Sequence, residues 1–122
     1  MDVIGSKCLT LWGSEVLGPV PEAQHVYLEA VKAPESWFAG VNKLVDRLLI
    51  TTGSTECLRD DDVALAELLR KHHKDVQIVV EKDGVHDGPF FDFAVDDPKL
   101  GGEVKQLMVE WLAVGMSLPG GS

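Results

Sequence analysis

Positive charge is scarce in this sequence. Eleven lysines and arginines stand against 20 aspartates and glutamates, which gives a formal net charge of −9 at pH 7. Binding to nucleic acid requires clustered Lys and Arg to neutralise phosphates, so the composition argues against a nucleic-acid partner and against anionic membrane surfaces. An acidic balance mainly favours solubility and identifies no substrate.

Long apolar runs are also missing. No stretch approaches the roughly 20 apolar residues that a membrane-spanning helix needs, and the start at residues 1–5 has neither a basic region nor an apolar core typical of a secretory signal. Cysteine is limited to Cys8 and Cys57, with no CxxC pair. These features predict a cytoplasmic protein without a membrane span, in which both cysteines are buried thiols outside any disulfide.

Several site motifs are absent. The sequence contains no HExxH or CxxC, and its glycine pairs fit neither GxGxxG nor GxxxxGK[ST]. His72 and His73 are adjacent, so on a helix they point to different sides and are poorly placed to chelate one ion. We therefore expect no metal and no cofactor.

A serine nucleophile is equally hard to find. The strand-to-helix elbow of serine hydrolases requires G-x-S-x-G, and the nearest string, at 115–119, lacks the second glycine and has no strand before it. Cys57 is an alternative nucleophile: a nearby helix N-terminus favours its thiolate, whereas the neighbouring Glu56 and the burial suggested by Leu58 oppose it. Neither candidate is favoured.

The organising feature of the chain is a strand–helix–strand unit. An apolar run rich in β-formers at 45–52 ends at Gly53, and a second strand is predicted at 76–80. Between them lies a run of helical period, which any of Asp60, Asp61 and Asp62 could cap. This order favours an α/β fold with a short parallel sheet.

The remaining elements are predicted to be helices and loops. A helix is expected at about 4–17, and a proline-rich loop at 19–40 ends in a short helical turn at 35–38. Trp37 and Phe38 are interpreted as core anchors, or alternatively as the lining of an acyl or aryl pocket. A last helix is expected at about 100–114, ended by Gly115. The chain is treated as one domain, 1–122, with a frayed tail at 117–122.

The two predicted strands are followed by loops that carry Glu56 and His86, respectively. Open α/β sheets place their sites beyond the carboxyl ends of the strands. A carboxylate can hold one imidazole nitrogen while the other faces substrate, so the two residues are candidate partners in acid–base chemistry. Phe90, Phe91 and Phe93 follow His86, and are interpreted as core packing of a short helix, as a hydrophobic collar beside the histidine, or as both.

These strings resemble the C-terminal part of α/β-hydrolase esterases of the hormone-sensitive-lipase type, especially fungal members. The similar segments are APESWFAG at 33–40, LITTGSTECLRDD at 49–61, and VHD at 85–87 with the phenylalanines beyond. The resemblance implies that Glu56 occupies the position of the triad acid, where the family commonly has Asp. It also implies that His86 is the triad histidine.

The resemblance implies an incomplete α/β-hydrolase fold, with two clear strands packed by about four helices. The family's first six strands, oxyanion-hole glycines and nucleophile elbow have no counterpart here, so the chain looks like a C-terminal third. A short sheet leaves its edges and apolar faces uncovered. We therefore expect self-association into a homo-oligomer, or pairing with a complementary hydrolase N-terminal half.

Two functions follow as expectations. The first is the C-terminal portion of a carboxylic-ester hydrolase, which supplies Glu56 and His86 for a small ester substrate but no nucleophile, and is inactive or slow alone. The second is a non-enzymatic α/β module for binding or self-association, derived from a hydrolase.

Overall fold

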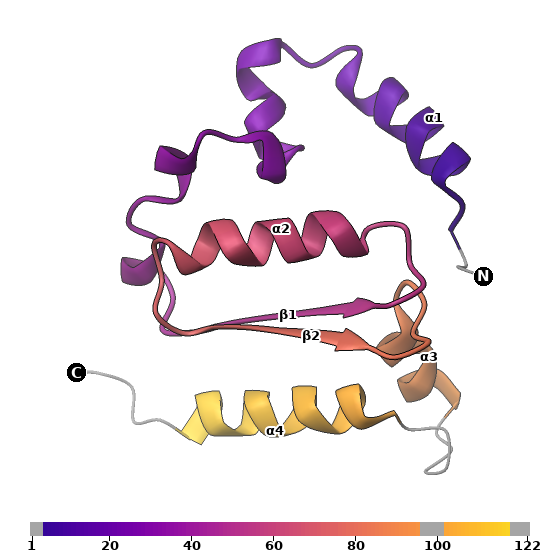
Figure 1. The fold of residues 1–122 in the computed structure, drawn as a ribbon, viewed down its shortest axis with the longest axis vertical. Coiled ribbons are helices and arrows are strands. Elements are labelled where there is room, and N and C mark those ends of the chain that lie inside the picture. The colour runs from indigo at the N-terminus through magenta and orange to yellow at the C-terminus, as the bar shows by residue number, and fades with distance from the viewer. Residues whose placement is uncertain (1–3, 96–101, 118–122) are drawn as a thin grey trace. The chain divides into compact units, whose positions relative to one another are not determined.

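Two parallel strands form the sheet of this mixed α/β protein. The computed structural model describes residues 4–95 and 102–117. Strand β1 (Leu48–Gly53) pairs in parallel with β2 (Val76–Glu81), and Leu48 lies opposite Val76 in the register. Helix α2 (Arg59–Arg70) connects them and lies along the sheet (Figure 1). The predicted strand–helix–strand unit with a parallel sheet is therefore confirmed.

The core of this unit lies between α2 and one face of the sheet. Ala66 and Leu69 of α2 are buried against Val76 of β2. Six half-buried apolar side chains surround this cluster: Phe38, Val41, Leu48, Ile50, Leu65 and Ile78. Leu48, Ile50, Val76 and Ile78 share a face because side chains alternate along a strand. The apolar period of α2 thus fixes which sheet face it covers.

The start of α2 differs from the prediction. No aspartate caps the helix, because its N-cap is Leu58, which makes no side-chain cap bond. Asp60, Asp61 and Asp62 instead occupy the first turn, where carboxylates stabilise the positive end of the helix dipole.

The segment before β1 is mostly short helical turns. Helix α1 (Ser6–Leu17) confirms the first predicted helix, and it is followed by the 3-10 turns η1 (Glu22–Tyr27), η2 (Ala30–Lys32), η3 (Glu35–Phe38) and η4 (Val41–Lys43). Phe38 packs on the core, as predicted. Trp37 is exposed and makes an edge contact with Tyr27, so the prediction that it is a core anchor is wrong.

The chain divides into two units, Met1–His86 and Asp87–Ser122. The second holds α3 (Gly88–Val95) and α4 (Glu103–Ser117). All three phenylalanines of α3 are exposed, which contradicts their interpretation as core packing. Helix α4 runs through Gly115, so that glycine does not end it. The predicted start of the last helix at Leu100 and the end of the predicted tail lie outside the described residues.

Both cysteines have exposed side chains, so the prediction of buried thiols is wrong. Within the described parts of the chain, no helix is long and apolar enough to cross a bilayer.

Candidate functional site

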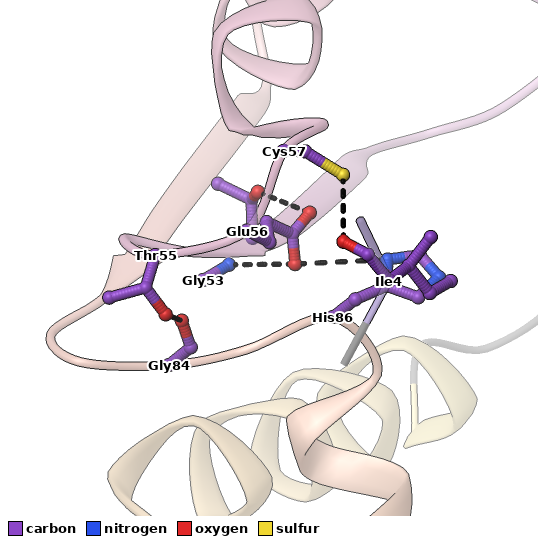
Figure 2. A network of polar contacts seen from close by, with 8 residues as sticks. Ile4, Gly53, Thr55, Glu56, Cys57, Gly84 and His86 are labelled. Carbon is purple, nitrogen blue, oxygen red and sulfur yellow. Dashed lines mark hydrogen bonds and ion pairs between the residues drawn. The ribbon is translucent and has the colours of Figure 1, made fainter. Parts of the chain in front are cut away.

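The loops that follow β1 and β2 are joined to each other by hydrogen bonds. The Ser54 amide donates to Glu81 O at 2.8 Å, and the Asp83 amide donates to the Ser54 hydroxyl at 2.8 Å. Both the amide and the hydroxyl of Thr55 donate to Gly84 O, at 3.0 and 2.7 Å (Figure 2). Because parallel strands end at the same edge of a sheet, these bonds hold the two loops together where a site is expected.

Glu56 is anchored by the end of β1. Its side chain is only 6% exposed. The Thr52 hydroxyl donates to Oε1 at 2.8 Å. The Gly53 amide donates to Oε2 at 3.1 Å (Figure 2). Hydrogen bonds to an ionised carboxylate are stronger than those between neutral groups. The loop therefore fixes the carboxylate in one orientation.

His86 lies beside the anchored carboxylate. Its Nδ1 is 3.9 Å from Glu56 Oε2, the oxygen that also accepts from Gly53 (Figure 2). The His86 side chain is 25% exposed. This separation is longer than a hydrogen bond but within the range of an ion pair, and acid–base contacts commonly tighten when substrate binds. The two residues singled out from the sequence are therefore neighbours, with Nδ1 facing the acid.

A second carboxyl group in the site was missed at the sequence level. Asp62, in the first turn of α2, lies close enough to Thr52 and Glu56 for both to influence its pKa. Burial raises the pKa of Asp62, and Glu56 raises it further, whereas the Thr52 hydroxyl lowers it. In the sequence, Asp62 is already explained as a helix-capping residue or as a charge that favours the helix dipole. Nothing in the sequence pattern indicates that it also lies near Glu56.

The candidate nucleophiles are not arranged as an elbow. Ser117 is the last residue of α4, and its hydroxyl donates to Ala113 O at 2.7 Å. The Cys57 thiol donates to Ile4 O at 3.4 Å (Figure 2). The burial that the sequence suggested for Cys57 is not observed.

The adjacent histidines make separate contacts. Nε2 of His73 lies 2.9 Å from Val45 O, and Nδ1 accepts from the Asp75 amide at 3.0 Å. This pattern requires the neutral ring with its proton on Nε2. His72 Nε2 lies 3.9 Å from Glu35, whose pKa is held below its usual range by Lys71. Over residues 4–95 and 102–117, no group of three His, Cys, Asp or Glu side chains is placed to hold a metal ion.

No protein-family model, curated protein or solved structure matches this chain.

Proposed function

We propose that this chain supplies the acid and the histidine of a carboxylic-ester hydrolase. The observation that carries the proposal is the approach of Glu56 Oε2 to His86 Nδ1, at 3.9 Å, with the carboxylate already fixed by Thr52 and Gly53. A carboxylate on Nδ1 orients the ring, favours the proton on that nitrogen, and stabilises the imidazolium that forms during acyl transfer. The resemblance of 33–87 to hormone-sensitive-lipase-type esterases points to the same two residues.

In this role His86 acts through Nε2, the nitrogen across the ring from Glu56. It removes the proton from an attacking hydroxyl as the new C–O bond forms, and then gives that proton to the leaving alcohol as the ester C–O bond breaks. Water repeats the cycle on the acyl-enzyme and releases the carboxylic acid. Glu56 stays ionised throughout and balances the positive charge on the ring.

The serine and the oxyanion donors would come from another polypeptide or chain segment, because the sequence contains no G-x-S-x-G. Alone, the chain can offer His86 only as a general base for water. We expect such hydrolysis to be slow, since no preorganised donors stabilise the tetrahedral oxyanion.

Hydrolysis of p-nitrophenyl acetate by the purified chain tests the proposal. We expect a rate proportional to protein concentration that falls to the buffer rate in His86→Ala and falls several-fold in Glu56→Ala. His25→Ala is the matched control, because His25 is also half-buried but contacts the Val20 carbonyl instead of an acid. Equal rates in the parent and His86→Ala would overturn the expectation that His86 acts as a general base for water in the isolated chain.

A second candidate is a non-enzymatic module that self-associates. Its support is the set of large apolar side chains that are more than a third exposed. On α1 these are Leu11, Trp12 and Val16, and on α3 they are Phe90, Phe91, Phe93 and Val95. Exposed apolar groups of this number are typical of contact surfaces. A mass measurement by light scattering that gave a dimer or larger species, with no His86-dependent hydrolysis, would favour this candidate.

A further inference from the structure

Two adjacent side chains of the loop after β1 bind the turn that follows β2. The Ser54 hydroxyl accepts from the Asp83 amide at 2.8 Å. The Thr55 hydroxyl donates to Gly84 O at 2.7 Å (Figure 2). The Thr55 amide donates to the same oxygen at 3.0 Å, so this carbonyl accepts two bonds from one residue. We call this set of contacts the loop clasp.

The clasp joins groups that are fixed on both sides. The Ser54 carbonyl accepts from Arg59 Nη1 at 2.9 Å, which ties it to the first residue of α2. In the second loop, the Gly84 amide donates to Glu81 O at 3.1 Å and closes a turn. Asp83 in this turn has a φ of 59°, a left-handed conformation that is uncommon for residues other than glycine. Such a conformation persists where surrounding contacts hold it, and the clasp supplies them.

The clasp also shortens the free chain between the sheet and His86. Glu56 is already held by the end of β1 through both of its oxygens, so the separation of the pair depends mainly on His86. His86 is five residues after Glu81, the last residue of β2, but only two residues after Gly84. Since an extended chain spans at most about 3.3–3.6 Å per residue, the clasp reduces the distance that His86 can move from its nearest anchor from about 17 Å to about 7 Å.

We propose that Ser54 and Thr55 are positioning residues, whose clasp on the second loop holds His86 within reach of Glu56. This inference rests on the proposed function, because it concerns the assembly of that acid–histidine pair. Both hydroxyls bond to backbone atoms of the second loop, so they act on the histidine through the chain. A pair held in this way is preorganised before an ester or a nucleophile arrives.

Nitrogen NMR of the neutral His86 ring reports whether the acid is within reach, because a carboxylate at Nδ1 favours the proton on that nitrogen. Thr55→Val removes the donating hydroxyl and keeps the shape of the side chain. Loss of one net hydrogen bond shifts the equilibrium between closed and open loops by roughly two- to tenfold toward the open form. The ratio of Nδ1–H to Nε2–H tautomer should therefore fall by about twofold or more, toward the ratio in Glu56→Ala.

Ser54→Ala removes the acceptor of the Asp83 amide and should lower the tautomer ratio to a similar extent. Thr55→Ser keeps the hydroxyl and should restore the parent ratio. Thr10→Val is the matched control, because the Thr10 hydroxyl also donates to a backbone carbonyl, that of Ser6 at 3.0 Å, but within α1. A purely structural role of the clasp would lower stability and leave the tautomer ratio of the folded chain unchanged.

Far-ultraviolet circular dichroism establishes that each variant is folded. The parent ratio in both Thr55→Val and Ser54→Ala would overturn the inference. A fall in Thr10→Val as large as that in Thr55→Val would also overturn it, as would the lack of recovery in Thr55→Ser. The same spectra separate the two claims. If Glu56→Ala leaves the parent ratio unchanged, the proposed function fails. If Glu56→Ala changes the ratio and the loop variants do not, only this inference fails.

Discussion

Gly53, the last residue of β1, lies backbone against backbone with Gly84 in the loop after β2. A Cβ atom on Gly53 would stand 2.3 Å from the Gly84 carbonyl oxygen and 2.8 Å from the Val85 amide nitrogen. Real Cβ atoms essentially never approach other atoms so closely. The close pairing of the loops that carry Glu56 and His86 therefore requires glycine at position 53.

Gly53→Ala should separate the two loops. We expect the free energy of unfolding to fall by about 1–3 kcal/mol, the usual cost of overpacking, because the clash is with backbone that cannot rotate away. Urea unfolding measures this. Gly13→Ala is the control: nothing lies within 4 Å of a Cβ there, so alanine in α1 should be neutral or stabilise by about 0.5–1 kcal/mol. Equal stability of Gly53→Ala and the parent would show that the loops part at no cost.

Thr52→Val should weaken the anchor of Glu56. Valine has nearly the same shape but removes the hydroxyl that donates to Oε1, so the buried carboxylate loses a charge-assisted bond. We expect a loss of about 1.5–3 kcal/mol in unfolding free energy. Thr51→Val is the matched control on the opposite face of β1, and it should change stability much less. A loss in Thr51→Val as large as that in Thr52→Val would argue against the anchor.

The raised pKa of Asp62 should make stability depend on pH. Burial and Glu56 raise this pKa above its ordinary value of 3.8, so the folded chain holds the Asp62 proton more tightly than the unfolded chain does. The contribution to stability is therefore fully present below pH 3.8 and is lost as the pH rises through the raised pKa. Urea unfolding across this window should show a decline in the parent relative to Asp62→Asn, which lacks the titrating group. A rise with pH in the unfolding free energy of the parent relative to that of Asp62→Asn would contradict this prediction.

Replacement of His73 by Leu should be costly. His73 is 4% exposed, and its removal leaves the Val45 carbonyl and the Asp75 amide without their ring partner. Both bonds are partly buried, and the net loss of each one costs about 0.5–1.5 kcal/mol. The neighbouring His72→Leu should cost far less, because the contact of His72 with Glu35 is a long one to an exposed carboxylate. Similar thermal midpoints for the two variants would contradict this assignment.

Both thiols should react in the folded protein. Cys8 and Cys57 are exposed, so an aromatic disulfide that releases a coloured thiolate should react with both in the absence of denaturant. Buried cysteines react slowly under the same conditions. A requirement for denaturant at either position would contradict the observed exposure.

The periodicity of the sequence was enough to predict the centre of the fold. The apolar run that ends at Gly53, the helical period after Asp62 and the run from Val76 specify a parallel strand–helix–strand unit. The placement of Glu56 near His86 followed from one rule, that parallel strands end at a common edge.

The rest depended on contacts that no local pattern encodes. Helix α2 begins at Arg59, so Asp62 lies in its first turn and not at its N-cap, and a boundary difference of a few residues is poorly predicted from sequence. Trp37 was predicted to be buried because aromatic side chains usually are, but η3 directs Phe38, its neighbour, onto the core instead.

The most direct test of the central claim is the nitrogen NMR spectrum of the neutral His86 ring in the parent chain and in Glu56→Ala. We predict that in the parent the proton resides mainly on Nδ1, the nitrogen 3.9 Å from Glu56 Oε2, and that it shifts toward Nε2 in the variant. The same tautomer distribution in both proteins would contradict the claim that Glu56 orients His86.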